Sequence, residues 1–164
     1  IHNYNEVIQS YLEDIIMNIL GYINKLIYTD IDAYKVFEEN GKTYAVKVEK
    51  KIDNSKVEAI NGGFCRVVLN NSELYADPNC EIVEIGKPFE ITKKNGVWGY
   101  KNFVSRNYLH GCCAIKEGCN DLELEQGEEF DTIYELTKTG KRKTTFVKLG
   151  NIENECHYFK DMNF

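Results

Sequence analysis

Three of the six cysteines and one of the three histidines lie within ten residues, HGCCAIKEGC at positions 110–119. Cysteine and histidine together can bind a metal or act as a nucleophile and its base, and cysteines can also pair as disulfides. Thiol catalysis requires a histidine beside the cysteine in space, and the proximity of His110 to Cys112, or of Cys156 to His157, along the chain does not show this. Common nucleophile, metalloprotease, phosphate-loop and dinucleotide motifs are also absent from the sequence. We therefore expect a protein that is not an enzyme and has no catalytic residue.

A metal site is an alternative interpretation of the same residues. Structural zinc sites usually show close-spaced ligand pairs such as Cys-x-x-Cys, and this sequence contains no such pair. Folding could still bring together six donors, namely His110, Cys112, Cys113, Cys119, Cys156 and His157. We predict no metal and no cofactor, and keep this set as the alternative.

Disulfides explain the cysteine pattern with fewer assumptions. Adjacent Cys112 and Cys113 would form a strained ring if paired with each other, so we expect two different partners for them. Cys119 and Cys156 are the nearest candidates, and Cys65 and Cys80 lie on predicted strands, but the connectivity stays open. The disulfide candidates are thus Cys65, Cys80, Cys112, Cys113, Cys119 and Cys156. This cysteine content favours an oxidising, extracellular or cell-surface location.

The charge balance argues against a nucleic-acid partner. The 164 residues include 20 Lys and Arg against 26 Asp and Glu, a net charge of -6, which gives a phosphate backbone little reason to bind. No apolar run approaches the roughly 18 residues that a membrane span requires. Because the sequence begins at Ile1 rather than Met, we expect membrane attachment only through a segment that precedes it.

The elements that must position these residues change character near residue 30. From Tyr4 to Tyr28, apolar residues recur at a spacing of three and four, which predicts one long amphipathic helix. The spacing then falls to two, as in KTYAVKVEK at 42–50, which indicates strands. Hairpin turns are predicted at Asn40-Gly41, Asn61-Gly62, Asn95-Gly96 and Thr139-Gly140. Strands are expected near 34–39, 42–50, 55–60, 63–69, 73–76, 80–85, 88–94, 97–104, 129–137 and 143–149.

These patterns predict an α+β fold in which a long N-terminal helix packs on an antiparallel β-sheet. We expect a single domain at 1–164, with the helix at 1–29, the β region at 30–164 and a cysteine-rich loop at 105–125.

Two phrases of the sequence resemble type IV pilins and their minor subunits. YNEVIQSYLEDIIMNILGYINKLI resembles the second half of a pilin spine helix, and CRVVLNNSELYADPNCEIVEIGKPFEITKKNGV resembles a pilin sheet. Together they cover about a third of the chain, and the cleavage site and first half-helix of the family are absent. The resemblance implies an extracellular assembly subunit of a pilus-like filament, acting in binding or adhesion. Its partners would be filament subunits or a surface protein.

A second resemblance gives an alternative function. ELYADPNCEIVEIGKPFEITKKNGVWGYKNFVSRNYL is similar to a bacterial SH3 module. This implies a small barrel at 64–109 that binds peptide or cell-wall peptidoglycan, with Tyr75, Trp98 and Tyr108 lining its groove. A third alternative, a small acidic inhibitor that occludes a partner's basic cleft, fits the net charge.

Overall fold

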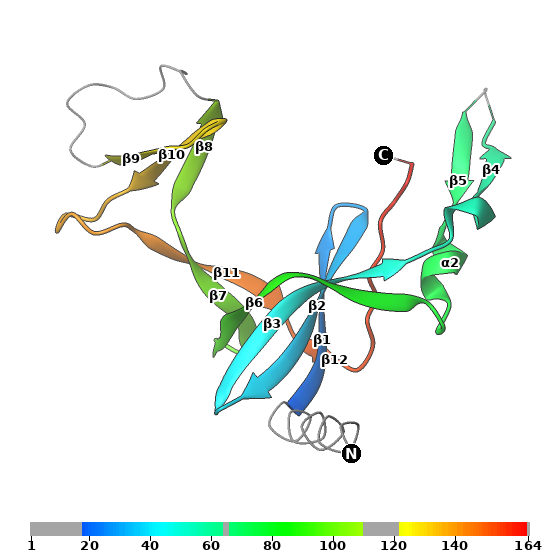
Figure 1. Ribbon diagram of the computed structural model, residues 1–164, viewed down its shortest axis with the longest axis horizontal. Helices are drawn as coiled ribbons and strands as arrows, with labels where there is room; N and C mark the ends of the chain where they lie inside the picture. Colours follow the sequence, from blue (N-terminus) through cyan, green and yellow to red (C-terminus); the bar gives the residue numbers. More distant parts are fainter. Residues whose placement is uncertain (1–17, 64–65, 110–121, 164) are drawn as a thin grey trace, which may run out of the picture. The chain divides into compact units, whose positions relative to one another are not determined.

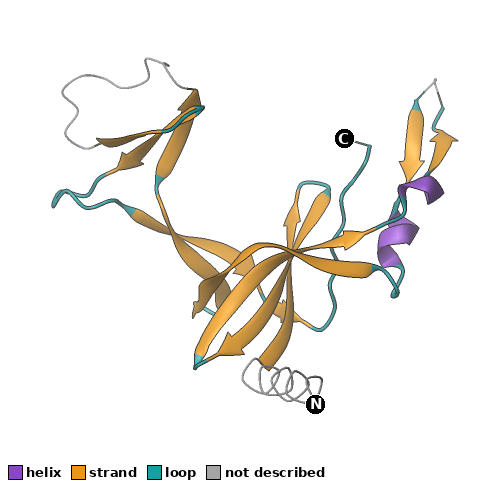
Figure 2. Ribbon diagram, viewed as in Figure 1, coloured by secondary structure: helices purple, strands orange, loops and turns teal. Residues whose placement is uncertain are grey.

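The computed structural model describes residues 18–63, 66–109 and 122–163, and these are mainly β-sheet, with 66% strand and 6% helix. Figures 1 and 2 show the strands and the short helical elements along the chain. The elements are β1 (Asn18–Ile27), β2 (Asp30–Glu39), β3 (Lys42–Lys51), η1 (Asn54–Lys56), β4 (Glu58–Asn61), β5 (Val67–Asn70), α2 (Ser72–Ala76), β6 (Glu81–Lys94), β7 (Val97–Phe103), β8 (Ser105–Leu109), β9 (Leu122–Gln126), β10 (Phe130–Glu135), β11 (Thr144–Gly150) and β12 (Ile152–Glu153).

The chain divides into two compact units. Unit 1 comprises residues 1–99 and 149–164, and unit 2 comprises residues 100–148. Strands β7 and β11 each run across the boundary between the two ranges. The single domain predicted from the sequence stays a prediction.

The main sheet is antiparallel and curls into a half-barrel. Its strand order is β11-β7-β6-β3-β2-β1-β12. Strands β1, β2 and β3 follow one another as two hairpins, and β3 pairs with the long strand β6. Shorter sheets are formed by β8, β10 and β9, and by β4 and β5.

The predicted N-terminal helix is wrong where the structure describes it. Residues 18–27 form strand β1, which pairs with β2 from Asn18 to Ile27, and the rest of the predicted helix lies outside the described residues. Burial alternates here, with Gly21 and Ile23 buried and Tyr22 between them partly exposed. The apolar residues of this segment keep a helical spacing, but isoleucine and tyrosine also favour strands, and pairing with β2 decides for the strand.

A glycine explains why β1 is accommodated in the sheet. Gly21 has a φ of 139°, and a Cβ atom there would collide with the carbonyl oxygen of Glu153 in β12. The register with β2 also shifts between Ile19 and Gly21. This position of β1 therefore requires glycine.

With the helix absent from 18–27, the α+β fold class and the resemblance to pilins are both wrong. No long helix occurs in the part of the chain that the structure describes, and the fold is mainly β. A pilin spine helix requires residues that here form the β1–β2 hairpin.

Two of the four predicted turns are confirmed in detail by backbone geometry. Asn40 and Gly41 have φ of 52° and 77°, and Asn95 and Gly96 have φ of 54° and 79°, as a two-residue hairpin turn with both central residues left-handed requires. A turn also lies at Thr139-Gly140, where the N–H of Gly140 donates to the carbonyl oxygen of Thr137 at 2.9 Å. Asn61 instead ends strand β4, and neither Asn61 nor Gly62 has a positive φ.

Most strands lie close to the predicted ranges. One expected strand, at 73–76, is instead the short helix α2, and the expected strands at 80–85 and 88–94 are one strand, β6.

A C-terminal segment, residues 152–163, packs on one face of the unit 1 sheet (red in Figure 1). Its backbone pairs with β1 at Glu153 and, further on, exchanges two hydrogen bonds between Phe159 and Ile31 of β2, at 2.8 and 3.1 Å. Between these points it buries side chains in a small hydrophobic cluster formed by Ala33, Val48, Tyr75, Cys156 and Tyr158.

Three asparagines hold this C-terminal segment in place. The amide of Asn24 donates to the carbonyl oxygen of Glu155 at 2.9 Å and accepts from the backbone N–H of His157 at 2.8 Å. Buried Asn71 donates to the carbonyl oxygen of Lys160 at 2.6 Å. The side chain of Asn163 accepts from the N–H of Leu69 and donates to its carbonyl oxygen. The segment is therefore fixed along its length, although it contains little regular strand.

Candidate functional site

The cysteine-rich loop predicted as the functional centre lies largely outside the described residues. His110, Cys112, Cys113, Cys119 and Cys65 are among those residues. The two described cysteines, Cys80 and Cys156, are free, so the expectation of disulfides is wrong for this part of the chain. Each of these thiols makes a contact other than a disulfide. Sγ of Cys80 donates to the carbonyl oxygen of Lys51 at 2.9 Å, and Cys156 packs in the hydrophobic cluster.

The alternative metal ligands are not brought together in the described chain. Cys156 and His157 are adjacent on the C-terminal segment, and the four other proposed donors lie outside the described residues. Within the described ranges, no group of three or more His, Cys, Asp and Glu side chains could hold a metal ion.

The three aromatic residues of the SH3-like alternative lie on separate elements. Tyr75 is on α2 and only 6% exposed, with its ring 5.6 Å from that of Tyr158 and 5.5 Å from that of Phe159. Burial raises the pKa of Tyr75. Trp98 on β7 and Tyr108 on β8 are partly exposed, and they belong to unit 1 and unit 2 respectively. Tyr75 therefore serves packing, and a groove with these residues stays a prediction.

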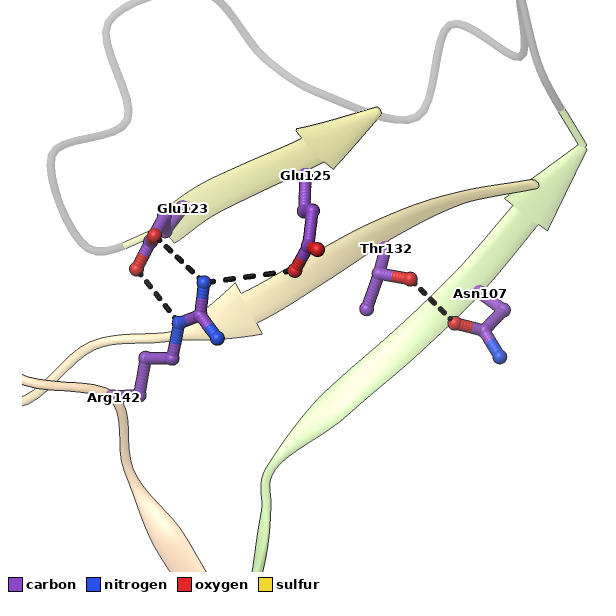
Figure 3. A network of polar contacts seen from close by, with 5 residues as sticks. All are labelled: Asn107, Glu123, Glu125, Thr132 and Arg142. Carbon is purple, nitrogen blue, oxygen red and sulfur yellow. Dashed lines mark hydrogen bonds and ion pairs between the residues drawn. The ribbon is translucent and has the colours of Figure 1, made fainter. Parts of the chain in front are cut away.

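Arg142 in unit 2 lies between the acidic side chains of Glu123 and Glu125 (Figure 3). Its Nε and Nη2 atoms donate to the two carboxylate oxygens of Glu123 at 3.0 and 2.9 Å, and Nη2 lies 3.6 Å from a carboxylate oxygen of Glu125. The guanidinium carbon is 3.7 Å from the centre of the Tyr134 ring. The hydrogen bonds from Arg142 lower the pKa of Glu123. Arg142 is thus committed to internal contacts of unit 2.

A hollow of about 510 Å³ lies in unit 1 between the C-terminal segment and the turn that joins α2 to β6. We call it the thiol hollow, because both described cysteines line it. Its walls are Tyr22, Lys50, Ala76, Asp77, Pro78, Cys80, Ile82, Asn154, Glu155, Cys156 and His157. Burial raises the pKa of the Cys80 thiol, while the charge of Lys50 opposes the rise. Cys80 is therefore a thiol at neutral pH, which is a poorer nucleophile than a thiolate.

Among the described residues of unit 1, the most exposed apolar group lies at the end of the first hairpin. We call Leu26, Ile27 and Tyr28 the β1–β2 tip. Leu26 is 72% exposed, Ile27 36% and Tyr28 96%. Tyr28 also has a φ of 54°, in the left-handed region that bulky residues rarely adopt.

Sequence reasoning missed this tip because it placed the three residues at the end of a helix. The available signal was two apolar runs on either side of Tyr28-Thr29, with a spacing that fits a two-residue hairpin connection. Neither residue is Asn, Gly or Asp, which are the usual indicators of such a turn.

The chain shows no match to a known protein family, to a curated protein or to a solved structure. Among the described residues, no helix has both the length and the apolar character needed to cross a membrane. The proposals below therefore rest on the chain's own residues.

Proposed function

We propose that this chain is a binding protein without catalytic turnover, and that it contacts a protein partner through the β1–β2 tip. The observation that carries the proposal is Tyr28, an aromatic side chain that is 96% exposed and held at a φ of 54°. Backbone outliers that the surrounding structure maintains are concentrated at functional positions.

The other hairpin turns of the same sheet contain residues that tolerate a left-handed backbone, and the β1–β2 tip does not. The β2–β3 and β6–β7 turns both use Asn-Gly, which adopts left-handed conformations with little strain. Tyrosine at the corresponding position costs about 1–2 kcal/mol, because its Cβ approaches the following carbonyl oxygen. Nearly complete exposure leaves the ring little packing within the chain to offset this cost.

The composition of the tip suits a protein surface as the ligand. Tyrosine combines a large apolar ring with a hydroxyl group and is enriched among the residues that dominate binding energy in protein interfaces. Leu26 and Ile27 extend the apolar area directly beside it. A partner with an apolar pocket and a hydrogen-bond acceptor for the Tyr28 hydroxyl would bury all three side chains.

An extracellular or cell-surface location stays a prediction. Its main sequence argument was the expectation of disulfides, and Cys80 and Cys156 are free. The acidic-inhibitor alternative also requires a protein partner, but it would use charge rather than the apolar tip.

Site-specific photo-cross-linking tests the proposal. A benzophenone amino acid is placed at position 28 of the full chain in the cells that produce it, and at position 40 as the control, because Asn40 is exposed at the next hairpin turn of the sheet. We expect one defined protein adduct from position 28 and none of that mass from position 40. The same adducts from both positions, or none from position 28, would contradict the proposal.

A further inference from the structure

Strands β4 and β5 pair only with each other and form a two-stranded sheet of their own (Figure 1). All four residues of β4 are exposed, including Ile60 at 49%. A two-stranded hairpin is marginally stable in water, and stable sheets have three or more strands with a covered hydrophobic face. We infer that β4 pairs with β4 of a second copy of this chain, which makes one four-stranded antiparallel sheet. This pairing uses other residues than the β1–β2 tip and does not depend on it.

The outer edge of β5 is already occupied. The side-chain oxygen of Asn163 accepts from the N–H of Leu69 at 2.6 Å, and the Asn163 amide donates to the carbonyl oxygen of Leu69 at 3.2 Å. The C-terminal segment therefore binds the backbone groups that β5 would offer to a further strand. The other edge of the hairpin, along β4, is left for pairing.

The outer edge of β4 is open. The N–H of Gly62, just after β4, donates to the carbonyl oxygen of Arg66 at 2.6 Å and continues the β4–β5 register. Because backbone groups alternate in direction along an antiparallel strand, Ala59 and Asn61 direct their N–H and C=O groups away from β5. In the part of the chain that the structure describes, these outward groups have no hydrogen-bond partner. Such an edge is a template for another strand.

The outward groups allow a symmetric register with a second copy. Ala59 exchanges hydrogen bonds with Asn61 of the second copy, and Asn61 does so with the Ala59 of that copy. Ile60 then lies opposite Ile60 of the second copy on the two-fold axis, and each is flanked by Val68, its neighbour in β5. The aliphatic side chains form one continuous row on one face of the new sheet, and such cross-strand pairs stabilise a sheet.

Charge complementarity favours a second copy as the partner. In this register Glu58 lies opposite Gly62 of the second copy, and the next residue in the same row is the Arg66 of that copy. Glycine has no side chain to separate them, so the exposed Glu58 and Arg66 side chains meet across it, once at each end of the strand pair. A Cβ atom at Gly62 would lie 2.7 Å from Cγ2 of Val68, which places the aliphatic row and the charged pairs on the same face.

The register and the size of the contact define what to measure. The other symmetric register, centred on Ala59, would set the carboxylate of Glu58 against Ile60 and is disfavoured. Pairing of two four-residue strands buries much less than the roughly 1,200 Å² of a stable protein interface. The dimer is therefore weak and reversible, and it forms only at high protein concentration.

Sedimentation equilibrium of the full chain, at concentrations up to about 1 mM, tests the pairing. A reducing agent is present so that no dimer arises from cysteine oxidation. We expect a monomer–dimer equilibrium in the wild type. Glu58→Arg and Arg66→Glu should each raise its Kd about tenfold, and the double variant should restore it. Glu73→Arg, the same change of charge at an exposed position of α2, is the control and should dimerise like the wild type.

A benzophenone amino acid in place of Ile60 tests the register. Irradiation should give a covalent dimer whose cross-link maps to residues 58–62 of the second copy, and circular dichroism confirms that each variant is folded. A wild type that stays monomeric at about 1 mM would overturn the proposal. So would single charge variants that dimerise like the wild type, a double variant that does not regain the affinity, or a cross-link that maps elsewhere.

Discussion

Replacing Tyr28 with asparagine should make the protein more stable. The left-handed conformation at a φ of 54° costs a tyrosine about 1–2 kcal/mol, and asparagine tolerates it far better. The ring is 96% exposed, so its removal forfeits only about 0.2 kcal/mol of apolar burial. We therefore expect Tyr28→Asn to raise the free energy of unfolding by about 1 kcal/mol, which corresponds to about 2–4 °C in Tm for a chain of this size.

Thermal and urea unfolding of the two proteins measure this difference. The reciprocal variant Asn40→Tyr is the matched control, because Asn40 is exposed at the next turn and has a φ of 52°. It should lose about as much stability as Tyr28→Asn gains, about 1 kcal/mol. If Tyr28→Asn is no more stable than the wild type, or if Asn40→Tyr costs nothing, the strain argument is refuted.

Two further predictions concern other contacts. Arg142→Ala should accelerate amide hydrogen exchange in β9 and β10. Arg142→Lys should not restore protection, because lysine cannot pair with Glu123 through two parallel hydrogen bonds. Equal exchange in Arg142→Lys and the wild type would refute this role of Arg142. Burial raises the pKa of Tyr158 to about 12, above its value near 10 in an unfolded chain, so its contribution to stability is complete below pH 10 and is lost as the pH rises toward 12. Urea unfolding at successive alkaline pH values should show this loss in the wild type and a smaller one in Tyr158→Phe, and identical profiles would contradict it.

The β region could be predicted from local chemistry, whereas the N-terminal region could not. Asn40-Gly41 and Asn95-Gly96 specify their turns through conformations that other residues avoid, so their hairpins are visible in the sequence. The segment from Asn18 to Ile27 has the apolar spacing of a helix, and only its pairing with other strands shows that it is a strand. One partner, β12, is more than 120 residues away and imposes the requirement for Gly21.

The candidate sites could not be predicted from the local sequence for the same reason, because they depend on contacts between distant residues. Cys80 and Cys156 line one hollow only because the C-terminal segment packs against the sheet beside α2, and no short spacing records this. Tyr28 lies in a turn without the usual turn residues, so its exposure becomes visible only once β1 is known to be a strand. The spacing of His110 and Cys112 attracted attention, but it concerns residues that the structure does not describe.

The most direct test of the account is the affinity of Tyr28→Asn for the purified protein that position 28 cross-links. Isothermal titration calorimetry with the wild type and with Asn40→Ala gives the reference values. We expect the Kd of Tyr28→Asn to rise about 30-fold, the loss of about 2 kcal/mol typical of a dominant aromatic contact, while Asn40→Ala binds like the wild type. Because Tyr28→Asn is expected to be the more stable protein, unfolding would not explain such a loss. An unchanged Kd would contradict the central claim that the β1–β2 tip is the binding surface.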